Sequence, residues 1–355
     1  MPSALARRLA SAPVLILDGA LATELERRGA DLADPLWSAR CLIEEPDLIR
    51  AVHLDYLRAG ADILTTATYQ ATFEGFARRG IGRPAAARLM RAAVALACAA
   101  RDEYRAECAR AEDRAPALIA ASVGPYGAML ADGSEYRGHY GLTDQALAAF
   151  HRPRLEVLAE SGADLIACET LPSRQEAEVL ARLLEGLPHV TAWMSFACRD
   201  EAHNAQGEDV AHCAQALDGC ARVAAVGVNC TRPELVGDLL ERMRSATQKP
   251  LLAYPNSGER YDAADKCWRE GPSTRSLASW APQWRRAGAR LIGGCCRTGP
   301  AEIAALRAAL APADGPVSPA GPTSTAGTAG TAGPTGPTGP ASPPPAGYTR
   351  PASAR

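Results

Sequence analysis

The sequence predicts a single (β/α)8 barrel, the α/β fold also called the TIM barrel. Three observations favour it. About eight short apolar runs recur along the chain, each is followed by a helical pattern or a long loop, and the series spans about 300 residues. Nearly uninterrupted apolar runs are typical of parallel strands, because helices cover both faces of such a sheet.

The expected strands are short and consist mostly of aliphatic residues. Each is expected to lie in the wall of the barrel, with its carboxyl end at the same rim as the others. In chain order they are residues 14–17, 62–66, 117–123, 164–168, 190–196, 223–228, 250–253 and 290–292.

Helical patterns separate these strands, and the clearest cover residues 84–111, 144–161, 173–185, 233–246 and 300–310. Thr143 and Ser173 are suited to act as N-caps, and Pro233 and Pro300 suit a first helical turn. Three glycines that each follow a helical stretch suit a left-handed C-cap: Gly60, Gly162 and Gly288.

A doubly wound sheet is the alternative α/β fold. A glycine-rich phosphate-binding turn after the first strand would favour it. The sequence after the first strand, Asp18-Gly19-Ala20-Leu21-Ala22-Thr23, lacks the G-x-G-x-x-G pattern of that turn. The barrel is therefore the preferred interpretation.

The last part of the chain differs in composition. Residues 312–355 are mostly Pro, Gly, Ala, Thr and Ser, without an apolar face that could offset the entropy lost on ordering. We expect a barrel domain at residues 1–311 and a disordered tail at 312–355.

Charge and hydropathy exclude several classes of partner. The chain has 38 basic and 40 acidic residues and a net charge of -2, which gives no field that would attract nucleic acid. It has no apolar run of about 18 residues, as a membrane span requires, and no convincing signal peptide. We expect a cytoplasmic protein, a monomer or small homo-oligomer, that acts on small molecules.

Polar and reactive residues gather directly after the expected strands. In a (β/α)8 barrel the active site lies at the carboxyl ends of the strands. The segments found there are Asp18-Gly19, residues 65–70 with Tyr69, residues 124–127, Glu169-Thr170, Asn229-Cys230, residues 254–259 beginning with Tyr254, and Gly293-Gly294-Cys295-Cys296.

Three of the 11 cysteines stand out from the rest. Cys230 ends the sixth strand, and Cys295 and Cys296 end the eighth. In a closed barrel only one strand separates these two. Three thiolates with a fourth position open would form a catalytic metal site, and they favour zinc over magnesium or calcium. The alternatives are buried apolar cysteines or a disulfide, which a reducing compartment disfavours.

The expected chemistry follows from the ligands. A zinc site with three thiolates is a poor Lewis acid for hydrolysis, but it is suited to binding a fourth thiolate from a substrate and lowering the pKa of that thiol. The bound sulfur can then attack an alkyl carbon. The site therefore favours alkylation of a thiol over activation of water.

Two carboxylates end strands one and four. Asp18 and Glu169 would face the mouth of the barrel, where each could accept hydrogen bonds from a substrate ammonium group. The alternatives are a helix N-cap for Asp18 and a surface position for Glu169.

Taken together, these motifs resemble the homocysteine S-methyltransferase family. The resemblance covers about residues 10–310. It is carried by Asp18-Gly19-Ala20 with Thr23-Glu24, Glu169-Thr170, Gly227-Val228-Asn229-Cys230, Tyr254-Pro255-Asn256-Ser257-Gly258 and Gly293-Gly294-Cys295-Cys296. The combination of Asn-Cys with Gly-Gly-Cys-Cys is highly specific.

The resemblance implies a zinc-dependent S-methyltransferase with one Zn2+ per chain, held by Cys230, Cys295 and Cys296. Its methyl acceptor would be L-homocysteine, whose sulfur becomes the fourth zinc ligand. Asp18 and Glu169 would hold the amino group of homocysteine. The remaining residues expected to line the substrate site are Gly19, Tyr69, Thr170, Asn229 and Tyr254.

The methyl donor is open at this stage. The stretch Tyr254-Pro255-Asn256-Ser257-Gly258-Glu259 is similar to enzymes that use S-methylmethionine, with S-adenosylmethionine as a second donor. Betaine-using relatives share the zinc site, and another zinc barrel enzyme such as a hydrolase, or a non-catalytic zinc-binding protein, remains as an alternative. Aromatic rings could hold an onium donor, and the candidates are Tyr69, Phe73, Tyr126, Tyr254 and Trp268.

Overall fold

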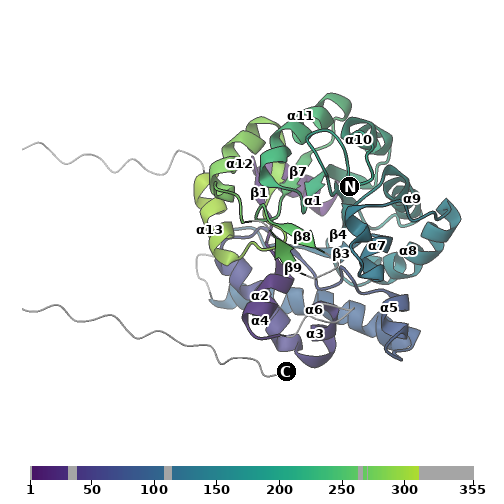
Figure 1. Ribbon diagram of the computed structural model, residues 1–355. Coiled ribbons are helices and arrows are strands. Elements are labelled where there is room, and N and C mark those ends of the chain that lie inside the picture. Colours follow the sequence, from purple (N-terminus) through teal and green to yellow (C-terminus); the bar gives the residue numbers. More distant parts are fainter. Residues whose placement is uncertain (1, 31–37, 108–113, 263–266, 270, 312–355) are drawn as a thin grey trace, which may run out of the picture. The chain divides into compact units, whose positions relative to one another are not determined.

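A computed structural model gives the fold of the chain (Figure 1). It describes residues 2–30, 38–107, 114–262, 267–269 and 271–311. The described residues make one domain that ends at Ala311. The tail expected at 312–355 lies outside them, as does the end of the helix expected at 84–111.

Eight parallel strands form one sheet, and its two edges meet. The strand order is β1-β10-β7-β6-β5-β4-β3-β2, and a parallel bridge between Leu17 and Ile63 joins the two edge strands. The predicted barrel is thus confirmed, with a strand at each expected run. The strands are β1 (Leu15–Ile16), β2 (Ile63–Thr65), β3 (Leu118–Val123), β4 (Leu165–Leu171), β5 (Ala192–Phe196), β6 (Val223–Asn229), β7 (Leu251–Tyr254) and β10 (Ala289–Ile292).

Helices surround the strands as an outer ring (Figure 1). A small antiparallel hairpin, β8 (Arg260–Asp262) with β9 (Cys267–Arg269), follows β7. The helices are α1 (Ala4–Ser11), α2 (Leu21–Arg27), α3 (Ser38–Glu44), α4 (Pro46–Arg58), α5 (Phe73–Ala77), α6 (Arg83–Glu107), α7 (Tyr126–Leu130), η2 (Ser134–Tyr136), α8 (Asp144–Ala159), α9 (Arg174–Glu185), α10 (Val210–Asp218), η3 (Pro233–Leu235), α11 (Val236–Ala246), α12 (Leu277–Arg286) and α13 (Pro300–Ala309).

The predicted N-cap residues and the glycines predicted at helix C-termini are also confirmed. Thr143 Oγ1 accepts a hydrogen bond from the Ala146 N–H at 3.2 Å, and Ser173 Oγ accepts one from the Glu176 N–H at 3.3 Å. The three predicted C-cap glycines have left-handed φ angles, +100° at Gly60, +88° at Gly162 and +112° at Gly288.

The inside of the barrel is a core of its own, closed at the amino ends of the strands by α1. Leu5 and Leu9 of this helix pack with interior residues that include Trp193. Arg290 fixes the end of α1 by donating to the carbonyl oxygens of Leu9 at 2.7 Å and Pro13 at 2.6 Å. With this end filled, the carboxyl ends of the strands are left for a substrate.

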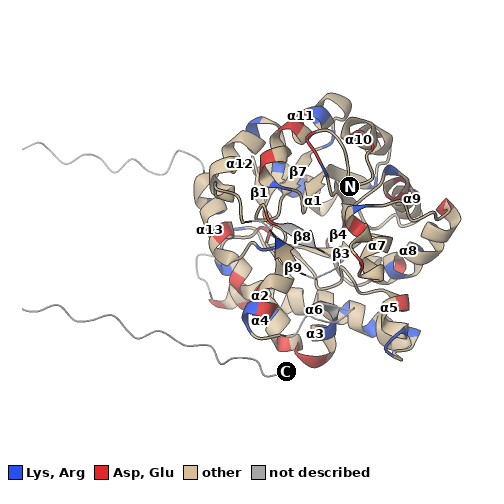
Figure 2. Ribbon diagram, in the orientation of Figure 1, with Lys and Arg blue, Asp and Glu red and all other residues tan. Residues whose placement is uncertain are grey.

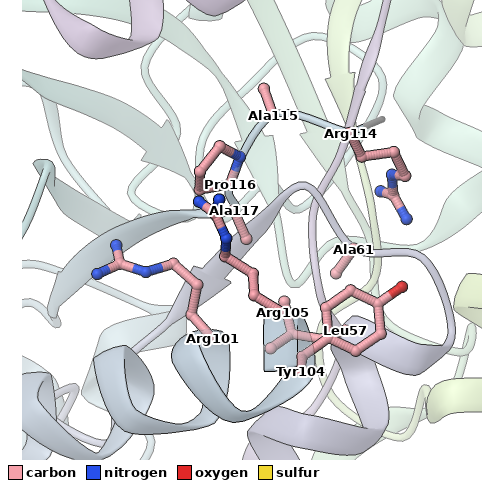
Figure 3. A pocket seen from close by; sticks show the side chains of 9 residues that line it. All are labelled: Leu57, Ala61, Arg101, Tyr104, Arg105, Arg114, Ala115, Pro116 and Ala117. Atoms are coloured by element: carbon pink, nitrogen blue, oxygen red, sulfur yellow. The ribbon is translucent and has the colours of Figure 1, made fainter. Parts of the chain in front are cut away.

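A shallow pocket also lies near the amino ends of the strands, beside Ala61 and Ala117 (Figure 3). Two of its arginines already have partners. Arg114 pairs with Asp62 at 2.8 Å, and Arg101 pairs with Asp164 at 3.6 Å. This pocket is at the opposite end of the barrel from the predicted active-site residues, so we assign it no part in the chemistry.

Charged residues of both signs are interspersed over the outer helices (Figure 2). This distribution agrees with the nearly balanced count of acidic and basic side chains. Among the described residues, no helix combines the length and the apolar character needed to cross a membrane.

A buried polar network ties α8 and α9 to the end of β3. His151 Nε2 lies 2.8 Å from Glu176 Oε1, which also accepts the Tyr126 N–H at 2.7 Å. Arg154 donates to His151 Nδ1 at 2.8 Å and to the carbonyl oxygen of Gly124. Burial lowers the pKa of His151 to about 4, so the ring is neutral and Nε2–H donates to the carboxylate.

Replacing Glu176 with alanine should lower the free energy of unfolding by about 3 kcal/mol or more. The change leaves buried Arg154 without its nearby carboxylate and two N–H groups without their acceptor. Urea denaturation measures the loss. Glu178→Ala on the same helix is the control, because its pair with Arg174 is at the surface and should contribute no more than about 1 kcal/mol. Equal losses in the two variants would show that the network is not stabilising.

Candidate metal centre and active site

Three thiols converge at the carboxyl ends of β6 and β10. The sulfur atoms of Cys230, Cys295 and Cys296 all lie within 4.8 Å of one another. The distance from Cys230 Sγ to Cys296 Sγ is 3.3 Å, whereas a disulfide bond measures about 2.05 Å. All three are free thiols, so the structure brings the predicted cysteines together without a disulfide.

The backbone around the thiols is fixed by hydrogen bonds from neighbouring strands. Cys230 has a φ of +46°, an uncommon conformation for a residue with a side chain, and its N–H donates to the Tyr254 carbonyl at 3.1 Å. The Cys295 N–H donates to the Pro255 carbonyl at 2.7 Å. The turns that direct the sulfur atoms toward one point are therefore held by β7 and the loop after it.

Gly293 and Gly294 are needed for space. Neither is among the glycines with a positive φ, so a left-handed backbone is not what requires glycine at these positions. A Cβ on Gly293 would lie 2.5 Å from the Leu17 Cβ, and one on Gly294 would overlap Thr298 Oγ1. Gly293 thus allows the chain after β10 to pass close to the segment that follows β1, and Gly294 allows it to pack against Thr298.

Asn229 and Thr170 bind each other beside the thiols. The Thr170 N–H donates to Asn229 Oδ1 at 2.7 Å, and Asn229 Nδ2 donates to Thr170 Oγ1 at 2.8 Å. Asn229 Nδ2 also lies 3.8 Å from Cys295 Sγ. Both residues were predicted to line the substrate site; the structure shows that together they join β4 to β6 and that Asn229 contacts a thiol.

Tyr136 is a site residue that sequence reasoning missed. It lies on η2, in the loop after α7, and its hydroxyl is 3.2 Å from Cys230 Sγ. Its neighbour Glu135 is buried close by. The only signal in the sequence was a polar stretch between glycines, Gly133-Ser134-Glu135-Tyr136-Arg137-Gly138, with no apolar pattern to place it.

The thiols share negative charge unevenly. Hydrogen bonds from Cys295, Cys296 and Tyr136 lower the pKa of Cys230 well below its ordinary value. The same hydrogen bonds to Cys230 raise the pKa values of Cys295 and Cys296. Ionisation of Cys230 is thus favoured, and the negative charge of its thiolate opposes the ionisation of the other two thiols. A bound cation would remove that opposition, so the donor set fits a thiophilic metal such as zinc.

Asp18 and Glu169 are both buried at this mouth of the barrel, 3% and 8% exposed. Asp18 accepts hydrogen bonds from the Thr65 N–H at 2.7 Å and the Thr65 hydroxyl at 2.9 Å. Glu169 accepts from the hydroxyls of Ser122 and, at 3.0 Å, Tyr254. The two alternatives are therefore wrong: Ala20 is the N-cap residue of α2, and Glu169 is not at the surface.

Neither carboxyl has a cationic partner among the described residues. Burial raises the pKa of Asp18 to about 8, and the charge of Glu169 adds to the effect. Burial raises the pKa of Glu169 to about 7, with a smaller contribution from Cys230. Two desolvated carboxyl groups next to a thiol cluster make a site suited to a ligand that carries both a thiol and an ammonium group.

Gly19 and Tyr254, both predicted to line the site, lie next to these carboxyls: Gly19 follows Asp18 in the chain, and Tyr254 contacts Glu169. A Cβ on Gly19 would lie 2.9 Å from the Thr298 carbonyl, so glycine allows the end of β1 to pack against that loop. Tyr254 is 3% exposed, and its hydroxyl accepts from Trp193 Nε1 at 3.0 Å while it donates to Glu169. The structure thus gives Tyr254 a contact through which it positions Glu169.

The other aromatic candidates differ in their surroundings. Tyr69 is hydrogen-bonded to Thr170, and its pKa is raised by burial and by nearby Glu135 and Cys230, which places its ring at the site. Tyr126 packs edge-on against other aromatic rings, and Phe73 lies under the Arg83 guanidinium at 4.2 Å. Trp268 lies on β9 of the hairpin. Of the candidates outside β7, Tyr69 has the clearest link to the thiols.

Comparison with known proteins agrees with this arrangement. The sequence profile of the homocysteine S-methyltransferase family matches residues 15–310. The homocysteine S-methyltransferase of Escherichia coli (strain K12) is 53% identical over 296 residues, covering 83% of this chain and 94% of that protein. Homocysteine S-methyltransferase YbgG of Bacillus subtilis (strain 168) is 50% identical over 291 residues, covering 82% and 92%. The metallated form of the E. coli homocysteine methyltransferase MmuM superposes with a TM-score of 0.78 at 49% identity, covering 86% of this chain and 99% of that one.

Proposed function

Because the chain belongs to the homocysteine S-methyltransferase family and is a methyltransferase enzyme, we propose that it transfers a methyl group from a sulfonium donor to L-homocysteine on a zinc ion. The donor is S-methylmethionine, with S-adenosylmethionine as a second donor. The observation that carries the proposal is the convergence of three thiols within 4.8 Å beside two buried carboxyls that lack a cation among the described residues.

Cys230, Cys295 and Cys296 would hold the metal. A zinc ion bound there lowers the pKa of an incoming thiol and leaves its sulfur nucleophilic at neutral pH. The similar E. coli protein has a structure in a metallated form, which supports a metal at this place. Asn229, 3.8 Å from Cys295 Sγ, would keep that ligand oriented.

Asp18 and Glu169 would orient the acceptor. Both carboxyls must be ionised to pair with the homocysteine ammonium group, and the approaching positive charge lowers the pKa of each. Ser122, Thr65 and Tyr254 already donate to these carboxyls, so the oxygen atoms are held in place before the substrate binds. Binding energy is thereby used to aim the sulfur at the donor.

The transfer is a displacement at the methyl carbon. A new bond forms between the homocysteine sulfur and the methyl carbon, while the bond from that carbon to the donor sulfur breaks. Its electron pair stays on the donor sulfur, which becomes a neutral thioether, and the acceptor's thiol proton is released to solvent. With S-methylmethionine both products are methionine.

Comparing donors at fixed homocysteine tests the proposal. We expect S-methylmethionine to give the highest turnover, S-adenosylmethionine a lower one, and betaine at least about tenfold less, since a neutral thioether leaves more readily than an amine. Chromatography should find two methionines per homocysteine consumed with S-methylmethionine and one with S-adenosylmethionine. Betaine as the best donor would refute the donor assignment, and an absence of methionine with all three would refute the proposed function.

A further inference from the structure

A third buried acidic residue, Glu135, lies at the mouth of the barrel on the loop that follows α7. This loop is tightly packed. A Cβ on Gly127 of α7 would overlap the Glu135 backbone nitrogen, and the Asp132 carboxylate accepts the Ser134 N–H at 2.9 Å. The next residue, Tyr136, contacts Cys230 Sγ at 3.2 Å. The fold therefore holds Glu135 beside the thiol cluster.

One oxygen atom of the Glu135 carboxyl is buried without a partner, and the other is within hydrogen-bonding reach of the residue's own backbone N–H. The residue is 8% exposed, and its Oε2 atom is buried without a hydrogen bond. The basic side chain of Arg137, whose charge acts on Glu135, is 61% exposed and pairs with Asp132 at 3.9 Å. Burial raises the pKa of Glu135 to about 7, and the charge of Cys230 adds to that effect. A carboxyl left in this condition favours a ligand that brings a positive charge.

The other two carboxyls are accounted for by the methyl acceptor. Asp18 is held from β2 through Thr65, and Glu169 is held from β3 and β7. Glu135 comes from a different element, η2, which lies against β4 and reaches Cys230 through Tyr136. A homocysteine ammonium group held by Asp18 and Glu169 leaves Glu135 free for a second cation.

The proposed donor carries such a cation. A sulfonium sulfur has no N–H or O–H group, so it is recognised by charge and by aromatic faces. Glu135 is within electrostatic range of two tyrosines of the site, because its charge raises the pKa values of Tyr69 and Tyr136. A carboxylate within electrostatic range of two aromatic side chains is a suitable environment for a sulfonium group.

We propose that Glu135 binds the positive charge of the donor's sulfonium group and so determines specificity for a cationic methyl donor. This inference rests on the proposed function. Methyl transfer neutralises the sulfonium group, so the interaction is lost in the product thioether. Glu135 would thus favour binding of the cationic donor over binding of the neutral thioether that remains after transfer.

Glu135→Gln tests the inference, because it removes the charge and keeps the size. In the zinc-loaded enzyme we expect the KM for S-methylmethionine to rise at least tenfold, while the KM for homocysteine and the bound zinc stay within twofold of the unchanged protein. Glu160→Gln, which removes an exposed carboxylate, should change neither KM. A donor KM within twofold of the original, or an equal rise in both KM values, would overturn the proposal.

Calorimetry with trimethylsulfonium chloride separates this inference from the proposed function, because it requires no turnover. The zinc-loaded protein should bind trimethylsulfonium, and Glu135→Gln should bind it at least tenfold more weakly. The affinity for neutral dimethyl sulfide should be the same in the two proteins. Equal trimethylsulfonium affinity in the two proteins would refute the role of Glu135 even if homocysteine is methylated. A difference would support that role even if methylation failed.

Discussion

Replacing Cys296 with serine should remove the metal and the activity together. Serine offers a hydroxyl that stays protonated at neutral pH and a hard oxygen atom where zinc prefers a soft thiolate. Because the other two ligands, Cys230 and Cys295, cannot form the site alone, we expect zinc content to fall from one per chain to a small fraction. Turnover should fall by at least about a hundredfold. This loss exceeds that of a typical substitution of a residue that only orients a metal ligand. Elemental analysis of the purified protein and a methionine assay measure the two losses.

Cys98→Ser is the matched control. Cys98 is a partly buried thiol on α6, far in the fold from the ends of β6 and β10, and its replacement should leave metal and activity unchanged. The metal assignment is wrong if Cys296→Ser keeps both zinc and activity. If the variant loses activity but keeps a full equivalent of zinc, Cys296 is not a ligand and acts in another way.

The barrel was predictable because its strands are continuous apolar runs between helical patterns. All eight runs are strands, and the bridge between Leu17 and Ile63 closes β1 on β2. The exact ends were less predictable. β4 continues through Glu169 and Thr170 to Leu171, because hydrogen bonds to Asn229 hold Thr170 in the wall of the barrel at a φ of +62°. A contact of that kind joins residues far apart in sequence and leaves no local pattern.

The convergence of the cysteines with Asp18 and Glu169 was also predictable, since parallel strands place their carboxyl ends at one rim. The contributions of η2 were not. Glu135 and Tyr136 belong to a polar loop without apolar periodicity, and their approach to Cys230 depends on the packing of Gly127 against the loop. Similarly, the hydroxyl of Tyr254 reaches Glu169 because of the direction that β7 gives the side chain inside the barrel, which the sequence alone does not reveal.

Asp18→Asn should have opposite effects on substrate binding and on stability. The variant loses a charge-assisted contact to the homocysteine ammonium group, and we expect the homocysteine KM to rise about tenfold to a hundredfold. Glu169→Gln should raise it in the same way. Steady-state kinetics with a saturating sulfonium donor measure the change. Serine in place of Thr65 keeps one hydroxyl donor to Asp18 and serves as a conservative control for the position of the carboxyl.

The stability effect follows from the raised pKa. In the free protein the Asp18 carboxyl has a pKa of about 8, against an ordinary value of 3.8 in the unfolded chain. Between these values the folded state binds one proton more than the unfolded state, so this group makes the protein less stable as the pH rises from about 4 to 8. Asparagine cannot ionise, and Asp18→Asn should therefore melt at least about 2 °C higher at pH 8, with the difference vanishing near pH 4.

These two effects have one origin, so they must appear together. A carboxylate that is destabilised by burial in the free protein gains most when an ammonium ion binds next to it. Homocysteine should therefore raise the melting temperature of the unchanged protein but not that of the variant. A higher homocysteine KM without a gain in stability would mean that Asp18 is already ionised in the free protein. A gain in stability with an unchanged KM would mean that the buried carboxyl does not meet the substrate, and the acceptor site would have to be placed around Glu169 alone.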